Sequence, residues 1–329
     1  MADSKPKSGG MGTLALLFVL WYGFNAHYNI SNKRVLNVYS YPYMTSFIQV
    51  LCGFAVMMIY WGSGMQKPPK LTVGEALKLL PIALLHAGGH LAAVLSMGAG
   101  AVSFTHIIKA SEPVFSTLIG PLFGVPIAPL FVNLCLLPIV GGVAYAAMKP
   151  GQGLDLSELL GYASAMAMCS NVAFALRGIL SKKVMTPEYK KEKNMDASNT
   201  YAVLTILSAF ILLPPALLME GKPAVDDLLG AEDKASLYQT LGACGLSYYL
   251  YNEMGFRVLG KLDPVSTAVG NTIKRVVIMV AAVAFLGEKM TPNKASTFHV
   301  VGALIAVAGT LAYSLAKNAA ANKDKAKKA

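Results

Sequence analysis

Three cations interrupt two apolar runs of the chain that are each long enough to cross a bilayer. Lys274 and Arg275 stand side by side in residues 264–286, and Lys109 stands in residues 101–122. A cation at the centre of a membrane helix costs roughly 2.5–3.5 kcal/mol on insertion scales. Such residues persist where they face water or an opposite charge, so these runs predict a polar interior.

Carboxylates that could pair with these cations are scarce in the apolar runs. Glu112 lies three positions after Lys109, and Glu253 lies in a further run. We expect both to support ion pairs, and a purely structural Lys109–Glu112 pair is one alternative. The simplest partner for the remaining positive charge is an anion. Arginine grips phosphate oxygens with a planar fork and lysine adds a point charge, so Lys109, Lys274 and Arg275 are predicted to bind a phosphate group.

Four more polar side chains are candidates for lining the same site. Tyr251 and Asn252 directly precede Glu253, and Tyr251 could donate its hydroxyl to a substrate. Arg177 lies deep in another apolar run, where it either lines the site or pairs with one of the two glutamates. His106 either lines the site or packs against its neighbours.

Two histidines, His86 and His90, are one helical turn apart and therefore share a helix face. This spacing can ligate zinc, but no carboxylate or thiol stands nearby in sequence to complete a site. A hydrogen bond from His90 to a substrate oxygen is the better prediction, and no metal site is expected.

The chain shows no arrangement typical of an enzyme. It has no GxSxG motif and no glycine-rich phosphate loop. Its four cysteines are scattered through apolar runs without the spacing of a metal motif. The net charge of +11 lies mostly in connectors and in the lysine-rich C-terminal end, so nucleic acid is not an expected partner. We expect neither catalysis nor a cofactor.

The elements that must position these residues are apolar helices. The chain is 55% hydrophobic and 14% charged, with a mean hydropathy of +0.52, which indicates a protein embedded in a lipid bilayer. Runs of about 20 apolar residues predict an all-α membrane protein with ten transmembrane helices. Their expected ranges are 11–31, 43–62, 74–97, 101–122, 126–147, 157–181, 197–219, 236–257, 264–286 and 297–316. The third, fourth, eighth and ninth runs are interrupted by glycine, proline or charge.

Loop charges indicate how these helices are arranged. If both termini lie on one side of the membrane, that side collects 16 lysines and arginines and the other side collects 7. The positive-inside rule therefore favours an even number of helices with both termini on the positive side.

The two halves of the chain look alike. Val102-Ser103 recurs as Val265-Ser266, and Gly124 recurs as Gly287, each 163 positions later. Five helices per half is an odd number, so the second copy must enter the membrane inverted. We expect two inverted five-helix repeats, residues 11–150 and 151–316, between a polar tail (1–10) and a basic tail (317–329). Carriers built in this way hold their substrate near mid-membrane, where the cations of both halves would converge.

Several motifs resemble those of a known family. In chain order they are Gly89-His90-Leu91, residues 101–109 (AVSFTHIIK), residues 112–116 (EPVFS), residues 177–183 (RGILSKK), Leu250-Tyr251-Asn252 and residues 270–277 (GNTIKRVV). With these motifs in order over residues 11–315, the chain resembles the plastidic phosphate translocators of the drug/metabolite transporter superfamily. Only residues 187–194 look like an insertion.

The resemblance implies an exchange of inorganic phosphate for small phosphorylated metabolites across the inner plastid envelope. It implies that Lys109, Lys274 and Arg275 hold the phosphate, while His90 and Tyr251 contact the phosphate or the organic part. Triose phosphate and 3-phosphoglycerate are the expected organic substrates, and the termini are expected in the stroma.

Two departures from the family pattern leave the substrate subgroup open. Plant triose-phosphate members usually carry histidine at the position of Thr267 and Ser-Lys-Val at residues 98–100. A nucleotide-sugar or nucleoside monophosphate antiporter of the same superfamily and an anion channel are the alternative functions. The sequence fixes no oligomeric state.

Overall fold

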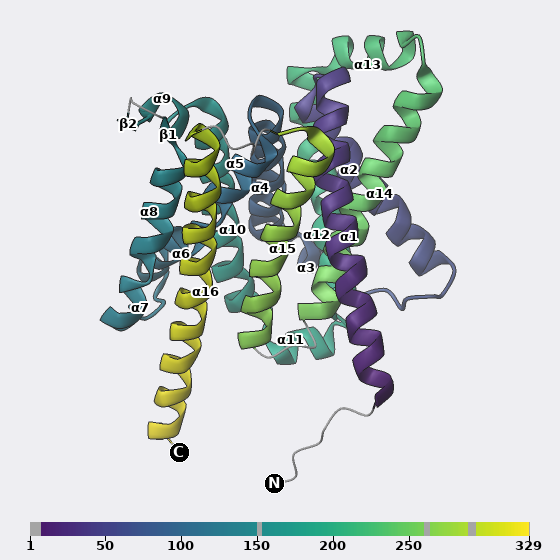
Figure 1. The fold of residues 1–329 in the computed structure, drawn as a ribbon. Coiled ribbons are helices and arrows are strands. Elements are labelled where there is room, and N and C mark those ends of the chain that lie inside the picture. Colours follow the sequence, from purple (N-terminus) through teal and green to yellow (C-terminus); the bar gives the residue numbers. More distant parts are fainter. Residues whose placement is uncertain (1–7, 150–152, 260–263, 289–293, 329) are drawn as a thin grey trace.

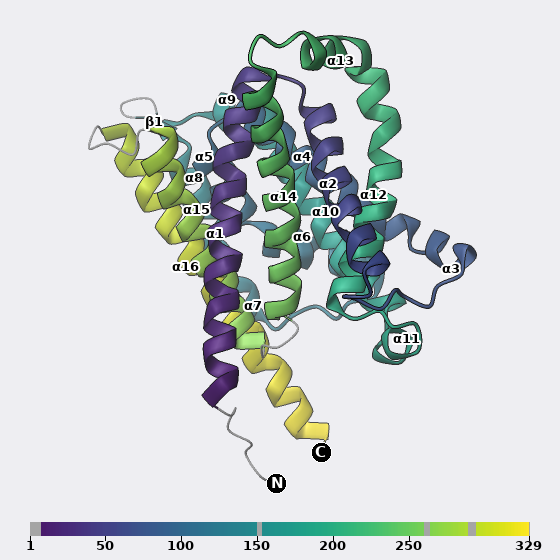
Figure 2. The same cartoon turned by 90° about the vertical axis from the view of Figure 1, so that its right-hand side faces the viewer.

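Long helices run side by side between two ends of the molecule, and α1 begins at the same end where α16 finishes (Figures 1 and 2). We call this the terminal end and the other the opposite end. The computed structural model describes residues 8–149, 153–259, 264–288 and 294–328. Lys5, Lys7, Lys261 and Lys289 of the loop-charge argument, and most of the expected tail 1–10, lie outside these residues.

The described residues of the first half form nine helical pieces. They are α1 (Ser8–Val38), α2 (Pro42–Gly62), α3 (Val73–Leu77), α4 (Leu80–Ala99), α5 (Val102–Lys109), α6 (Glu112–Ile119), the 3₁₀ turn η1 (Gly120–Phe123), α7 (Leu130–Leu134) and α8 (Leu136–Ala146). The two short strands β1 (Met148–Lys149) and β2 (Gly153–Leu154) then pair antiparallel.

The described residues of the second half form helices that range from the four-residue α9 to the 35-residue α16. They are α9 (Leu156–Leu159), α10 (Tyr162–Val184), α11 (Pro187–Glu192), α12 (Ala197–Met219), α13 (Gly221–Gly230), α14 (Lys234–Leu259), α15 (Pro264–Leu286) and α16 (Lys294–Lys328). α14 and α15, which correspond to the eighth and ninth expected helices, each run without a break.

Over the residues that the structure describes, the protein is all-α apart from the β1–β2 pair, in agreement with the predicted all-α class. Within the described residues, six helices are long and apolar enough to cross a membrane, namely α2, α4, α10, α12, and the parts of α15 and α16 over Val269–Leu286 and Thr297–Lys323. A shorter apolar stretch covers Leu130–Ala146. The expected count of ten membrane-spanning helices stays a prediction.

The expected helix over residues 101–122, an interrupted run in the sequence, is divided into α5, α6 and η1. α5 ends at Lys109, and α6 begins at Glu112 with Pro113 in its first turn. Proline has no N–H to donate to the carbonyl of Lys109, and its ring crowds that carbonyl, so Pro113 disfavours one continuous helix here. Lys109 therefore lies at a helix end. The expected helices 74–97 and 126–147 are divided in the same way, into α3 with α4 and into α7 with α8.

Side chains from other helices satisfy carbonyl groups that this break releases. The side-chain amide of Asn171 in α10 donates to the carbonyl of Ile108, and the hydroxyl of Thr310 in α16 donates to the carbonyl of Ala110, both at 2.9 Å. A bilayer offers no water to do this, so a helix break at membrane depth requires such partners. The second half of the chain thus holds the end of α5 in place.

The interior contains many polar side chains beside its apolar core clusters, and much of the outer surface is apolar. Fully buried polar side chains include Asn25, Asn29, Asn32, Gln49, His86, His90, Ser170 and Asn171, whereas exposed apolar ones include Leu16, Val19, Phe210, Leu218 and Leu304. This distribution fits a bundle whose outer face contacts lipid and whose inner face carries polar chemistry.

Two glycines allow α8 and α16 to pack backbone against backbone. A β-carbon on Gly142 would lie 2.4 Å from the amide nitrogen of Ala306, and one on Gly302 would lie 2.5 Å from that of Ala146. Within α8, Gly142 and Ala146 are four residues apart, as are Gly302 and Ala306 within α16. This small-xxx-small spacing brings membrane helices close together. The contact joins the last helix of each half.

The residues that look like an insertion form α11 instead of an irregular loop. The hydroxyl of Thr186 caps the helix, and Pro187 occupies its first turn, where its missing N–H costs nothing. After α11, Asn194 donates to the carbonyls of Lys67 and Pro68, both at 3.0 Å. The insertion is therefore docked on the α2–α3 loop at the terminal end.

Candidate anion-binding site

Lys109 is held by a hydroxyl and an aromatic ring. Its ammonium donates to Ser170 Oγ at 2.6 Å, and that hydroxyl in turn donates to the carbonyl of Gly89 at 2.8 Å. The same ammonium lies 4.8 Å from the centre of the Phe174 ring. These contacts fix the position of the ammonium group without neutralising its charge.

Lys274 and Arg275, adjacent in α15, contact different helices. The Lys274 ammonium lies 5.0 Å from the centre of the Trp21 ring in α1, a cation–π contact that also leaves the charge uncompensated. The Arg275 guanidinium pairs with Glu112 of α6, with 3.3 Å between Nη2 and Oε2. Neighbouring residues on a helix point about 100° apart, which accounts for the two directions.

These cations form one cluster. Lys109 and Arg177 both lie over the Phe174 ring, and Arg275, next to Lys274 in α15, pairs with Glu112, which stands three positions after Lys109. Among the described residues of the cluster, four cations therefore face a single carboxylate. Glu112 forms its ion pair within 4 Å with Arg275, so the alternative of an exclusive Lys109–Glu112 pair is not what the structure contains.

Arg177 in α10 is paired with a histidine, not with a glutamate. Its Nη1 donates to Nδ1 of His86 at 2.7 Å, and its guanidinium lies 4.7 Å from the Phe174 ring centre. Because arginine only donates, His86 accepts at Nδ1 and is assigned the Nε2–H tautomer. Phe174 thus carries both Arg177 and Lys109 on one ring, which ties α10 to α5.

His90 lies one turn after His86 and stacks on Tyr248, with 4.1 Å between ring centres. Its Nε2 atom is buried and has no hydrogen-bond partner among the described residues. Gly89 lets α4 approach α10 here, because a β-carbon at this position would lie 3.1 Å from Phe174. His90 therefore lies next to α10, the helix that contains Arg177 and contacts Lys109 through Ser170 and Phe174.

His106 belongs to a hydrogen-bonded relay with α1. Both N–H groups of the Asn29 amide donate to Asn25, at 2.8 and 2.9 Å, so Asn29 Oδ1 must accept from His106 Nε2 at 2.8 Å. His106 is thereby assigned the Nε2–H tautomer, and its Nδ1 atom is buried with no partner in the described part of the chain.

Tyr251 and Asn252 lie on α14 near the same region. The Tyr251 ring packs against Tyr28 and Tyr248, with ring centres 5.2 and 5.7 Å apart. The Asn252 amide donates to the carbonyl of Tyr248 within its own helix at 3.0 Å. Tyr251 is thus part of an aromatic group that also includes the stacking partner of His90.

Glu253 is engaged elsewhere. This buried carboxylate accepts hydrogen bonds from Ser198, Tyr249 and Arg257, and its closest approach to Arg257 is 2.6 Å. Its ion-pair partner is therefore the neighbouring Arg257 on α14 and not a cation of the cluster.

Three residues that touch the cations were not anticipated from the sequence: Trp21, Ser170 and Phe174. An aromatic residue or a serine in an apolar helix carries no signal that separates a cation partner from ordinary packing. Within the described residues, no group of three or more His, Cys, Asp or Glu side chains is placed to hold a metal ion.

Comparison with known proteins decides the family. The model of the Triose-phosphate Transporter family matches residues 12–314. The chain belongs to this family. The resemblance found in the sequence motifs is thereby confirmed, and the family is one of transporters.

Curated relatives of this triose-phosphate transporter family member are chloroplastic translocators. The chain is 38% identical over 307 residues to phosphoenolpyruvate/phosphate translocator 1 of Oryza sativa subsp. japonica, covering 92% of this chain and 72% of the relative. It is 36% identical over 312 residues to glucose-6-phosphate/phosphate translocator 2 of Arabidopsis thaliana, covering 92% and 75%. It is also 36% identical over 308 residues to the triose phosphate/phosphate translocator of Brassica oleracea var. botrytis, covering 92% and 71%.

Proposed function

We propose that this transporter is an antiporter that exchanges inorganic phosphate for triose phosphate or 3-phosphoglycerate. The observation that carries the proposal is the charge of the cluster, in which Lys109, Lys274, Arg275 and Arg177 face only Glu112 among the described residues. A phosphate dianion supplies the negative charge that such a cluster needs. The names of the relatives support a phosphate site, because phosphate is common to all of them while the organic partner varies.

In this proposal the contacts with Ser170, Phe174 and Trp21 hold the ammonium groups apart and directed toward the substrate. Lys109, Lys274 and Arg275 bind the phosphate oxygens, and Arg177 adds a fourth cation. His90, His106, Tyr251 and Asn252 line the space for the organic part, since His90 and His106 each present a buried ring nitrogen without a partner in the described part of the protein.

The proposed architecture is ten membrane-spanning helices in two inverted repeats, residues 11–150 and 151–316. Two observations support it. The start of α1 and the finish of α16 lie at the same end of the bundle (Figure 1), and the cations of the cluster come from both halves of the chain. The proposed membrane is the inner envelope of a plastid, with the termini in the stroma, in line with the chloroplastic relatives and the loop charges.

Exchange follows from electrostatics in this proposal. Closing the bundle around uncompensated cations removes water from like charges, which costs several kcal/mol per ion. A bound phosphate dianion cancels that charge, so the occluded state is reached only with substrate present. Each passage then requires a substrate, and transport in one direction is coupled to transport in the other.

The proposal is tested by uptake of radiolabelled phosphate into proteoliposomes loaded with one compound at a time. The compounds are phosphate, 3-phosphoglycerate, phosphoenolpyruvate, glucose 6-phosphate and UMP. We expect fast uptake into vesicles loaded with phosphate or 3-phosphoglycerate and slow uptake into vesicles loaded with the other compounds. Uptake driven by UMP would instead indicate a nucleotide-sugar type of carrier, and preference for phosphoenolpyruvate or glucose 6-phosphate would change the proposed organic substrate.

A further inference from the structure

The connection between α4 and α5, which we call the α4–α5 tip (residues 98–103), is capped by a carboxylate from the other half of the chain. Glu288, just after α15, accepts hydrogen bonds from the backbone N–H groups of Val102 and Ser103, at 2.6 and 2.9 Å. Each carboxylate oxygen takes one N–H. Glu288 therefore satisfies two of the free donors of α5 and places a negative charge at the positive end of that helix.

A cation from α1 caps the other side of the same tip. The ammonium of Lys33 donates to the carbonyls of Met97, Gly98 and Gly100, at 2.9, 3.3 and 2.9 Å. An ammonium group has three N–H donors, and this lysine directs all of them to the C-terminal end of α4. Two opposite charges, one on α1 and one after α15, thus hold the tip at the opposite end of the bundle.

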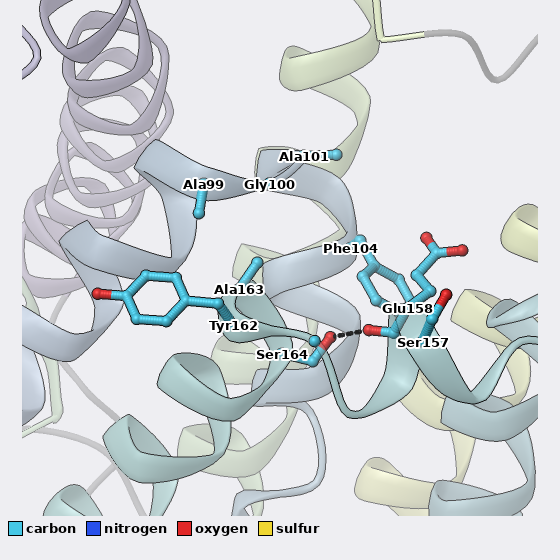
Figure 3. A pocket seen from close by; sticks show the side chains of 10 residues that line it. Ala99, Gly100, Ala101, Phe104, Ser157, Glu158, Tyr162, Ala163 and Ser164 are labelled. Atoms are coloured by element: carbon cyan, nitrogen blue, oxygen red, sulfur yellow. Dashed lines mark hydrogen bonds between the residues drawn. The ribbon is translucent and has the colours of Figure 1, made fainter.

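Packing behind the tip is incomplete. A hollow of about 300 Å³ separates part of the tip from the start of α10 (Figure 3). Its lining comes from Ala99, Gly100, Ala101 and Phe104 on one side and from Ser157, Glu158, Tyr162 and Ala163 on the other. Gly100 is the point of close approach, because a β-carbon there would lie 2.9 Å from that of Ala163. Val102 at the end of the tip is buried in the apolar core, so the two charged contacts act together with that packing to fix the tip.

The capping carboxylate has no counterpart in the first half of the sequence. The offset of 163 positions that relates Gly124 to Gly287 places Val125 opposite Glu288. Valine has no charge with which to cap a helix. The two ends of the bundle are thus chemically different at this pair of positions.

We propose that Lys33 and Glu288 form a latch that closes the transport path at the opposite end of the bundle. α5 carries the latch at its first residues and Lys109 at its last, so the latch also positions a cation of the substrate cluster. Opening this end breaks the two N–H bonds to Glu288 and frees the tip to move. The inference rests on the proposed function, because this end needs to open only if the protein is a carrier. Its test does not require transport.

The latch is tested by the reactivity of one thiol introduced beneath it. Ser103→Cys is made in a full-length variant whose four native cysteines are replaced, and the reaction of this thiol with a small water-soluble maleimide is timed in detergent micelles. Ser103 is 3% exposed, so the reaction is slow when the latch is closed. Glu288→Gln removes the charge and one of the two acceptors for N–H, and we expect the rate to rise about three- to tenfold.

Glu220→Gln is the matched control. The carboxylate of Glu220 accepts from the backbone N–H of Met44 near the start of α2, at 2.8 Å, so it is the same kind of contact at another helix N-terminus. We expect this variant to leave the reaction rate of the introduced thiol unchanged. A second reporter retains the native, buried Cys244 as the single thiol and measures general loosening of the bundle.

A faster reaction of the introduced thiol, with no rise at Cys244, supports the latch. No rise at the introduced thiol, a rise at both thiols, or an equal rise in Glu220→Gln overturns it. If Glu288→Gln does not fold, Glu288→Asp keeps the charge on a shorter side chain, and the same outcomes apply with a smaller expected rise. Phosphate exchange is measured on the same preparations, so loss of the proposed function and loss of the latch are separate results.

Discussion

Glu112 and Arg275 form an ion pair of 3.3 Å although 163 positions separate them in the sequence. The same offset relates Val102 to Val265 and Gly124 to Gly287. By this offset, the pair would join equivalent positions of the two proposed repeats. In the proposed two-fold repeat, equivalent residues can touch each other only near the axis that relates the halves, so this contact supports the proposal and would place the axis at the cation cluster.

Loss of Lys274 tests the role of the cluster in binding. Lys274→Gln removes one uncompensated cation, and we expect the apparent affinity for phosphate to fall about tenfold or more, with exchange becoming less strictly coupled. Concentration dependence of phosphate uptake measures the first effect, and efflux into substrate-free medium measures the second. The matched control is Lys317→Gln, which removes an ammonium 5.3 Å from the Tyr313 ring centre. Unchanged exchange kinetics in Lys274→Gln would contradict the proposed site.

Loss of Glu112 is expected to matter less than loss of Lys109. Glu112→Gln frees Arg275 from its ion pair, but the Glu112 side chain is 38% exposed, so solvent already weakens that pair. We expect a loss of apparent phosphate affinity of about threefold, against about tenfold or more for Lys109→Gln. Uptake kinetics of the two variants provide the comparison. The reverse order would show that Glu112, and not Lys109, is the main determinant of binding.

Adjacent glycines in α8 offer a test of helix packing. A β-carbon on Gly142 meets the backbone of α16 at 2.4 Å, whereas one on Gly141 has nothing within 4 Å. Gly142→Ala should therefore destabilise the protein by about 1–3 kcal/mol, and Gly141→Ala should leave its stability nearly unchanged. Thermal unfolding of both variants in the same detergent measures the difference. Equal melting temperatures would mean that α8 and α16 are not packed this closely.

The docking of α11 predicts a pH dependence of stability. Hydrogen bonds from the Lys193 ammonium and from Thr72 lower the pKa of Glu75 from its ordinary 4.5 to about 2. Since the folded-state pKa is the lower one, this contribution to stability is complete above pH 4.5 and is lost as the pH falls toward 2. The difference in melting temperature between the parent and Glu75→Gln should therefore shrink between about pH 5 and about pH 2.

Glu188→Gln, which alters an exposed carboxylate on α11, serves as the control for this pH series. We expect its melting temperature to follow that of the parent at every pH. A Glu75→Gln difference that stays constant down to about pH 2 would show that the Glu75–Lys193 contact does not stabilise the folded protein.

The helical class and the candidate cations were predictable because burial of charge in lipid is so unfavourable that Lys109, Lys274 and Arg275 stand out in the sequence. Their aromatic partners were not predictable, since Trp21 and Phe174 look like ordinary residues of an apolar helix. Pro113 marked the break after Lys109, but only the structure shows that Asn171 and Thr310 make that break tolerable. Pairings between distant residues, such as Glu288 with Val102, depend on tertiary geometry that no local pattern encodes.

Coupling is the central claim, and uptake of labelled phosphate into empty and phosphate-loaded proteoliposomes tests it most directly. If uncompensated cations forbid passage of the unloaded carrier, uptake occurs in loaded vesicles and stays at background in empty ones. Uptake into empty vesicles at a comparable rate would contradict the account and indicate a channel or a uniporter.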